Sequence, residues 1–279
     1  MADDVGIPTI HVCGIVAYDG TDYHGFQVQR GVATIQGTLE AALASFTTLT
    51  GRVVGAGRTD AGVHASGQVI AVQVAWRHSV EALQRAWNVH LPSTIAVRNL
   101  QLAPLGFHPR FSAIRRTYRY TLVQANRHTS FALPMRSPLT DRFALYETKP
   151  LDLDALCQAS TYLIGRHDFA TFGQPPQGEN TVRQLFQADW QLVKCDLAVL
   201  GNYPGQQVVF TVTADAFLRQ MVRNLVGTLL EVGRGHWAPN DVQAALAAQD
   251  RSLCAPPAPP QGLVLEVVEY PTHLGLLLK

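Results

Sequence analysis

A polar, glycine-rich turn between two apolar runs constrains the fold of this chain more than any other feature. The turn, Gly57 to His64, follows a short run at 52–56 that favours a strand. After it, apolar side chains alternate with others from Ile70 to Trp76, which predicts a strand leaving the turn. The motif is therefore expected on a strand-to-strand connection, where loops carry functional side chains on a rigid scaffold.

Arg58 and Asp60 stand two residues apart in this turn. A nearby guanidinium favours the ionised form of a carboxylate, and an ionised carboxylate in a cleft can act as a nucleophile or a base. The alternative is that Thr59 or Asp60 only caps a turn, and structural ion pairs outnumber catalytic ones. The residues alone leave both interpretations open.

The glycines around the turn do not form a nucleotide-binding loop. Gly51 and Gly57 are separated by five residues where a Walker loop has four, and Arg58 replaces its lysine. The run from Gly55 to Gly57 lacks the third glycine of the dinucleotide fingerprint, because Asp60 occupies that position. A nucleotide cofactor is therefore disfavoured.

The composition narrows the class of protein. Of 279 residues, 47% are hydrophobic and 15% are charged, which is typical of an ordinary globular protein. The acidic start predicts no signal peptide, and no apolar run approaches the roughly 18 residues of a membrane span. No histidines stand at metal-ligand spacing, so no bound metal is expected. The cysteines form no CxxC pair and are interpreted as reduced core thiols of a cytoplasmic protein: Cys13, Cys157, Cys195 and Cys254.

Arginines gather in two segments although the net charge is only +1. A neutral average can hide a basic stripe that binds nucleic acid, but solvated surface arginines explain either cluster alone. The clusters are Arg110, Arg115, Arg116, Arg119 and Arg127, and then Arg219, Arg223 and Arg234.

Periodicity predicts alternating strands and helices along the rest of the chain. Strands are expected at 10–18, 94–102, 117–124, 181–193, 206–213 and 262–270. Helices are expected from Ile35 to Leu49, from the N-cap Ser79 to His90, and at 153–164, 215–232 and 240–249. Each half mixes both kinds of element, so we predict two related α/β subdomains, 1–112 and 113–279, with a cleft between them.

Two segments of the second half contain candidate binding residues. Alternation places Tyr118 and Tyr120 on one strand face and Arg119 on the other, a pattern that suits RNA but equally suits a packed core. Arg219 and Arg223 are one turn apart on an expected apolar helix. There they need an anionic partner, such as Asp60 or a phosphate, unless both reach water.

Together these segments resemble one family, the A-type tRNA pseudouridine synthases. The similar stretches occur in family order and cover nearly the whole chain. They are Tyr18-Asp19-Gly20-Thr21, Gly57 to His64 with Ser66-Gly67-Gln68-Val69, Phe111-Ser112-Ala113, Arg116 to Tyr120, Asp168-Phe169, Thr181-Val182-Arg183, and Phe217 to Gly227 with Glu231-Val232-Gly233. One departure is Phe26, where the family often has a tryptophan.

The resemblance implies a fold and a reaction. The fold is α+β, with two similar subdomains that share a continuous, mostly antiparallel sheet flanked by helices, and an active cleft between them. The reaction converts uridine to pseudouridine at positions 38, 39 and 40 of the tRNA anticodon stem-loop. It needs no metal or other cofactor, and it implies a cytoplasmic homodimer that binds tRNA.

The resemblance also implies roles for five residues. Asp60 matches the essential aspartate, which either attacks C1′ of the ribose or removes the C2′ proton. Arg58 resembles the residue that fills the space left by the flipped uridine, and Tyr118 the tyrosine that packs on the flipped base. Arg223 resembles the arginine that pairs with the aspartate, and Arg219 is expected to contact RNA.

Two other functions stay open from the sequence. An RNA-binding protein without catalysis, such as an RNA chaperone, explains the arginines and tyrosines but gives Asp60 no task. An N-glycoside hydrolase needs a second carboxylate or an activated water, for which Asp19 and Asp22 are nearest in sequence.

Overall fold

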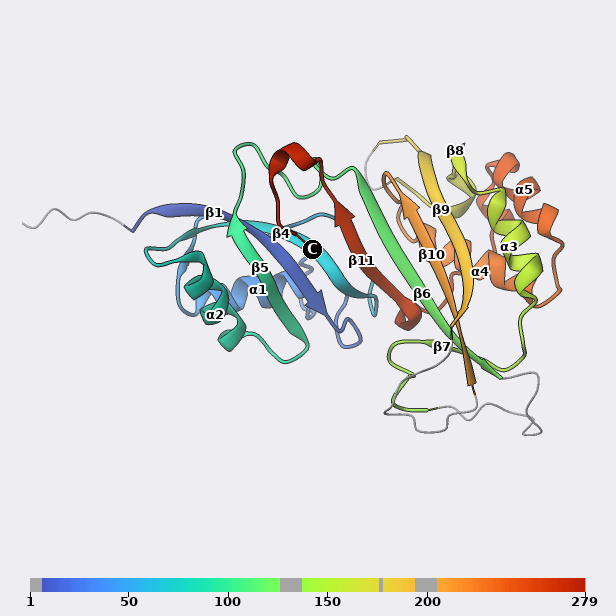
Figure 1. The fold of residues 1–279 in the computed structure, drawn as a ribbon, viewed down its shortest axis with the longest axis horizontal. Helices are drawn as coiled ribbons and strands as arrows, with labels where there is room; N and C mark the ends of the chain where they lie inside the picture. Colours follow the sequence, from blue (N-terminus) through green and yellow to red (C-terminus); the bar gives the residue numbers. More distant parts are fainter. Residues whose placement is uncertain (1–6, 126–136, 176–177, 194–204, 279) are drawn as a thin grey trace, which may run out of the picture. The chain divides into compact units, whose positions relative to one another are not determined.

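The computed structural model describes residues 7–125, 137–175, 178–193 and 205–278 (Figure 1). These residues contain eleven strands, which belong to one sheet, and five α-helices. The predicted α+β class is confirmed. Contacts divide the chain into two compact units, one formed by 1–114 with 265–279 and the other by 115–264.

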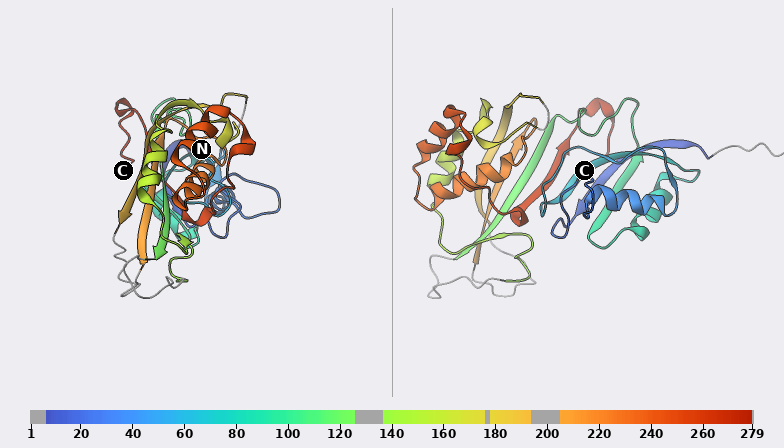
Figure 2. Two further views of the ribbon diagram at one scale, coloured as in Figure 1. Left: turned by 90° about the vertical axis from the view of Figure 1, so that its right-hand side faces the viewer. Right: turned by 180° about the vertical axis from the view of Figure 1, so that it is seen from behind.

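The first unit is an antiparallel set of strands with two helices. Its strand order is β5-β1-β4-β11, and the short β2 and β3 pair with β4. The two helices lie side by side (Figure 2). The buried indole of Trp87 on α2 donates a hydrogen bond of 3.1 Å to the Leu39 carbonyl on α1. The elements are β1 (Thr9–Tyr18), α1 (Ile35–Ala44), β2 (Thr48–Leu49), β3 (Val54–Gly55), β4 (His64–Ala75), α2 (Val80–His90), β5 (Ile95–Leu102) and β11 (Leu263–Glu269).

The second unit has strands in the order β6-β10-β9-β8, with β7 parallel to β6. Three helices pack together against these strands, and Figure 2 shows α4 lying across them in its second view. The indole of Trp190 on β9 donates to the Ser160 hydroxyl on α3 at 3.0 Å, which ties the helices to the sheet. The elements are β6 (Arg115–Ala125), β7 (Leu145–Glu147), α3 (Leu153–Thr161), β8 (Gly165–Asp168), β9 (Val182–Val193), β10 (Gly205–Ala214), α4 (Met221–Gly233) and α5 (Pro239–Ala248).

The expected helix from Ile35 to Leu49 is shorter than its apolar pattern suggests. α1 ends at Ala44, and the chain then pairs with β4 as β2, with Leu49 opposite Val74. The Thr47 hydroxyl also donates to the Ala75 carbonyl at the end of β4. Pairing with the sheet therefore prevails over local helical periodicity here.

The expected helix over 215–232 also starts later than predicted. Gln220 precedes α4 with a φ of 59°, a left-handed conformation that no α-helix accommodates. Arg219 forms an isolated β-bridge with Gln174. The prediction that Arg219 and Arg223 share one helix face is therefore wrong, because only Arg223 lies on α4.

The expected cap of α2 is present, and the expected domain division differs from the observed one at the C-terminal segment. Ser79 caps α2 by accepting the Ala82 N–H at 3.2 Å, as predicted. The segment 265–279 lies with the first unit, whereas the expected second domain was 113–279. A backbone hydrogen bond of 2.8 Å, from the Ile114 N–H to the Glu269 carbonyl, holds this segment within the first unit.

Three predictions from composition concern the cysteines, membrane-spanning segments and a bound metal. Cys13, Cys157 and Cys254 are free thiols, but only Cys13 is buried, Cys254 is half-buried and Cys157 is exposed, so the core assignment is wrong for Cys157. Cys195, Arg127 and the acidic start lie outside the described residues. Burial raises the pKa of the Cys13 thiol to about 12. No helix within the described ranges is long and apolar enough to cross a membrane. The same residues hold no group of three His, Cys, Asp or Glu side chains suited to a metal ion.

Candidate active site

The loop with Arg58 and Asp60 connects β3 to β4 in the first unit, so its predicted strand-to-strand position is confirmed. Its first residues are fixed by β4. The Ala56 N–H donates to the Val69 carbonyl at 2.8 Å. The fully buried amide of Gln68 bonds both backbone groups of Gly57, donating at 2.8 Å and accepting at 3.3 Å.

The middle of the loop is held by Thr59, whose side chain points into the protein. Thr59 is 6% exposed, and its hydroxyl shares a buried hydrogen bond of 2.8 Å with the Tyr18 phenol. Its carbonyl accepts the Phe26 N–H at 3.1 Å. Burial raises the pKa of Tyr18 to about 12, so the phenol stays protonated at neutral pH and can always serve this bond.

The loop passes so close to the turn after β1 that only glycines fit there. A Cβ on Gly20 would lie 2.0 Å from the Val63 carbonyl oxygen. Gly25, with a φ of +85°, would place a Cβ 2.6 Å from the Thr59 carbonyl oxygen. The turn after β1 and the loop therefore pack backbone against backbone.

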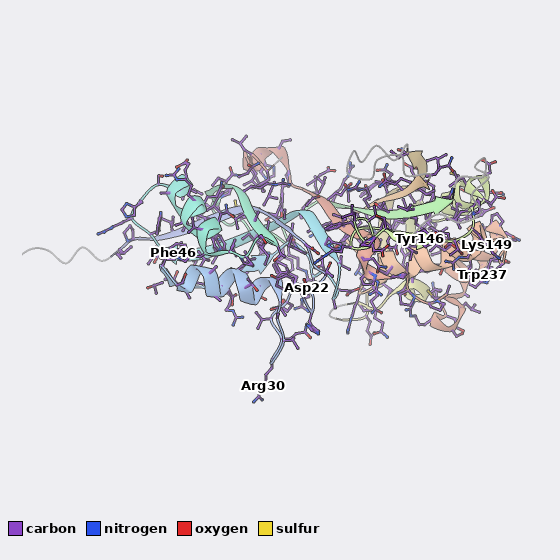
Figure 3. The ribbon with its side chains drawn as sticks, turned by 90° about the horizontal axis from the view of Figure 1, so that it is seen from below. Asp22, Arg30, Phe46, Tyr146, Lys149 and Trp237 are labelled. Carbon is purple, nitrogen blue, oxygen red and sulfur yellow. The ribbon has the colours of Figure 1, made fainter. Side chains whose placement is uncertain are left out.

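His64, the first residue of β4, is hydrogen-bonded to the same turn through its imidazole. It is 2% exposed, and its Nδ1 accepts the Gly20 N–H at 3.0 Å and lies 3.2 Å from the Asp19 carboxylate. Asp19 in turn accepts both the N–H and the hydroxyl of Thr21. Asp22 is exposed in this turn (Figure 3).

The anchored loop leaves its two charged side chains on the outside. Arg58 is exposed and Asp60 is half-buried, while Thr59 between them is buried. The Asp60 carbonyl accepts the Val63 N–H at 3.2 Å, which closes the turn with backbone groups. The carboxylate is thus presented from a loop whose backbone is fixed on both sides.

Tyr118 lies on β6 in the second unit and is 7% exposed. Its ring meets the Phe217 ring edge to face, with centroids 5.1 Å apart. Tyr120 lies two residues further along β6 and is fully buried, so the prediction that the two tyrosines share one strand face is confirmed. The Phe217 contact fixes the orientation of the Tyr118 ring.

Arg223 lies on α4 and is latched to the proline-rich segment before β11. Its Nε donates to the Ala258 carbonyl at 2.8 Å, and the Ala258 N–H donates back to the Arg223 carbonyl at 2.9 Å. Burial raises the pKa of the nearby Tyr120 phenol, and the positive charge of Arg223 partly offsets that rise. The Nε of Arg223 is thus engaged within the second unit.

Arg58 and Asp60 share one loop of the first unit, and Tyr118, Arg219 and Arg223 belong to the second unit. Arg219 is exposed, and its backbone N–H donates to the Gln174 carbonyl at 2.9 Å. The pairing of Arg223 with Asp60 stays a prediction.

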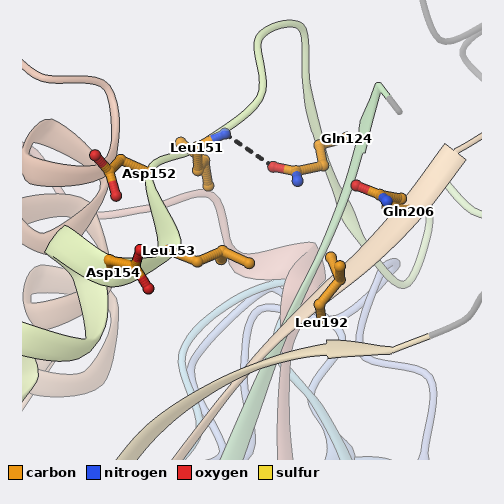
Figure 4. A pocket seen from close by; sticks show the side chains of 7 residues that line it. All are labelled: Gln124, Leu151, Asp152, Leu153, Asp154, Leu192 and Gln206. Atoms are coloured by element: carbon orange, nitrogen blue, oxygen red, sulfur yellow. Dashed lines mark hydrogen bonds between the residues drawn. The ribbon is translucent and has the colours of Figure 1, made fainter. Parts of the chain in front are cut away.

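A separate cavity of about 420 Å³ opens in the second unit and contains none of the predicted site residues (Figure 4). Within it the Leu151 N–H donates to the Gln124 amide oxygen at 3.0 Å. Its lining is Gln124, Leu151, Asp152, Leu153, Asp154, Leu192 and Gln206.

Three supporting residues escaped the sequence interpretation, although each lies in a stretch that resembles the family. Tyr18 and Gln68 hold the loop from inside, and Phe217 supports Tyr118. Periodicity identifies such residues only as buried. Their polar contacts join segments that are far apart in sequence, and one sequence does not reveal those pairs.

Comparison with known proteins identifies the family. The model of the tRNA pseudouridine synthase family matches residues 15–112 and 159–271. The chain belongs to the tRNA pseudouridine synthase family. The first matched segment contains Arg58 and Asp60, the second contains Arg219 and Arg223, and Tyr118 lies between the two.

Curated relatives extend the similarity to most of the chain. The tRNA pseudouridine synthase A of Chloroflexus aurantiacus is 42% identical over 264 residues, which cover 93% of this chain and 88% of the relative. The enzyme of the same name from Maridesulfovibrio salexigens is 40% identical over 260 residues, covering 92% of this chain and 89% of its own. The predicted family and the predicted class of enzyme, an isomerase, are confirmed.

Among solved structures, the archaeal box H/ACA sRNP Nop10-Cbf5 complex is similar with a TM-score of 0.36 and 10% identity. The similarity covers 84% of this chain and 47% of that one.

Proposed function

We propose that this chain isomerises uridine to pseudouridine at positions 38, 39 and 40 of the tRNA anticodon stem-loop, with Asp60 as the reacting carboxylate. We further propose that it works in the cytoplasm as a homodimer. The observation that carries the proposal is the anchored loop. In a chain of this family, Asp60 projects from a backbone fixed by Gln68, Tyr18 and Gly20.

The reaction conserves every atom, so a positioned carboxylate suffices in principle. The bond between N1 of uracil and C1′ of ribose breaks, the base turns, and C5 bonds to C1′. A proton leaves C5 and one is taken up at N1. Asp60 would act as the nucleophile at C1′ or as the base at C2′.

The other predicted residues have roles that their own geometry supports. Tyr118 offers a ring held by Phe217, which suits a residue that packs on a flipped base. Arg58 is exposed beside Asp60 and would occupy the space that the base vacates. Arg223 would pair with Asp60 through its terminal nitrogens, and Arg219 would contact the RNA backbone.

The test uses tRNA that carries tritium at C5 of uridine, because isomerisation releases that label. Wild type should release tritium, and Asp60→Ala should release none while it keeps its melting temperature and its affinity for tRNA. Asp60→Asn is the matched control for shape, and it should also be inactive. Full release by a folded Asp60→Ala enzyme would end the assignment, and free uracil among the products would indicate a hydrolase instead.

A further inference from the structure

Phe111 is a large aromatic residue that the proposed reaction leaves without a role. It belongs to the Phe111-Ser112-Ala113 stretch, yet its side chain is 76% exposed. Single exposed apolar side chains are ordinary on protein surfaces, so the case for a role depends on how the neighbours in the loop between β5 and β6 arrange this ring.

The loop around Phe111 is held in one conformation by His108. The His108 Nδ1 accepts the backbone N–H groups of Arg110 and Phe111 at 3.1 and 3.2 Å. The Ser112 N–H donates to the His108 carbonyl at 2.9 Å, and the Ser112 hydroxyl accepts the His108 N–H at 3.1 Å. These four hydrogen bonds fix the backbone from His108 to Ser112 around the imidazole.

The same loop is also held by Tyr270, which belongs to the C-terminal segment of the first unit. The Tyr270 hydroxyl donates to the Pro109 carbonyl at 2.7 Å. The Tyr270 ring packs against the buried Phe107 with centroids 5.2 Å apart. His108, Arg110 and Phe111 are thus carried by a loop that is anchored on both sides.

The rings and the charge of this loop are arranged together. The imidazole of His108 stacks on the Phe111 ring, with centroids 4.3 Å apart and planes inclined by 28°. The guanidinium carbon of Arg110 lies 5.6 Å from the centre of the same ring. We call His108, Arg110 and Phe111 the Phe111 platform.

We propose that the Phe111 platform binds an unpaired nucleotide of the substrate tRNA, with the base stacked on Phe111 and the phosphate beside Arg110. An aromatic face next to a cation is what RNA-binding proteins use for single-stranded nucleotides. Since His108 already orders the ring, little conformational entropy is lost on binding. The positive charge favours RNA over a second copy of the chain. This proposal rests on the proposed function, because it takes tRNA as the ligand.

The experiment measures the dissociation constant of tRNA by fluorescence anisotropy over a series of salt concentrations. Phe111→Ala should weaken binding about 5- to 150-fold, the range expected for one stacked base. Phe111→Leu should behave like Phe111→Ala because it keeps apolar volume without a π face, and Phe111→Tyr should bind like wild type. These variants should keep the salt slope of wild type, whereas Arg110→Gln should reduce that slope by about one.

Two results would overturn the platform. One is an unchanged dissociation constant for Phe111→Ala, and the other is weaker binding together with a changed molar mass of the free protein in light scattering. The second result would assign Phe111 to contact between copies of the chain. Tritium release measured on the same samples separates this proposal from the isomerase assignment. Wild type that binds tRNA without release refutes only the reaction, and Phe111→Ala that binds normally while wild type turns over refutes only the platform.

Discussion

The substitution Gly20→Ala tests whether the turn after β1 positions Asp60, the carboxylate proposed to react. A Cβ at this residue would lie 2.0 Å from the Val63 carbonyl oxygen, and Cβ atoms essentially never approach another atom within 3.0 Å. The obstacle is backbone, not a flexible side-chain end. The Val63 carbonyl or the Gly20 turn must therefore retreat by about 1 Å, the difference between these two distances.

The displacement reaches Asp60 through a single turn of the loop. The Val63 N–H donates to the Asp60 carbonyl at 3.2 Å, so Val63 does not move without straining that bond. A misplacement of about 1 Å at a reacting group costs roughly 100-fold in rate. We expect kcat for Gly20→Ala to fall about 100-fold with a nearly unchanged KM. We also expect the free energy of unfolding to fall by about 1–3 kcal/mol, as for other overpacked sites.

Single-turnover tritium release and denaturant unfolding measure the two effects. Gly51→Ala is the matched control, because a Cβ there would have its nearest neighbour, Gln73 Cβ, at an ordinary 3.7 Å. It should keep the wild-type rate and lie within about 0.5 kcal/mol of wild-type stability. A folded Gly20→Ala enzyme with the wild-type kcat would refute the claim that this turn positions Asp60.

Three further outcomes follow from other contacts. Gly227→Ala in α4 should lower the free energy of unfolding by about 1–3 kcal/mol although alanine favours helices, because its Cβ would lie 2.0 Å from the Pro256 carbonyl oxygen; urea denaturation measures this. Tyr18→Phe should lower it by about 1–2 kcal/mol by removing the buried partner of the Thr59 hydroxyl, and a double-mutant cycle with Thr59→Val should show coupling. The hydrogen bond with His236 is the largest cause of the lowered pKa of the Glu231 carboxyl group. The Glu231 carboxylate therefore adds stability above its unfolded pKa of about 4.3, and the advantage of wild type over Glu231→Gln should vanish as the pH of the urea series falls through the lower, folded pKa.

Local signals in the sequence were sufficient for the position of the loop. The alternation after His64 places Ile70, Val72 and Val74 in the core, where each is at most 2% exposed. Apolar alternation records which side chains face the core, so it reveals a strand without knowledge of its partners. The cap at Ser79 was equally predictable, because a cap bonds within its own helix.

The contacts that fix the site join distant segments, and local patterns do not contain them. The hydrogen bond between Tyr18 and Thr59 spans 41 positions, and the one between Gly20 and His64 spans 44. The prediction of where α4 starts was wrong for a related reason. Its upstream residues have an apolar phase that suits a helix, but the bridge between Arg219 and Gln174 holds them outside it.

The anchoring of Thr59 bears on how Arg58 and Asp60 divide their roles. The residues alone left a catalytic pair and a structural pair open, and the resemblance implied that Asp60 reacts while Arg58 serves the flipped RNA. In the structure, Thr59 is the buried residue of the three, so its two neighbours project away from the core on either side of it. Under the proposed function, the backbone of Thr59 sets the spacing between Arg58, which would serve the RNA, and Asp60, which would react at the ribose.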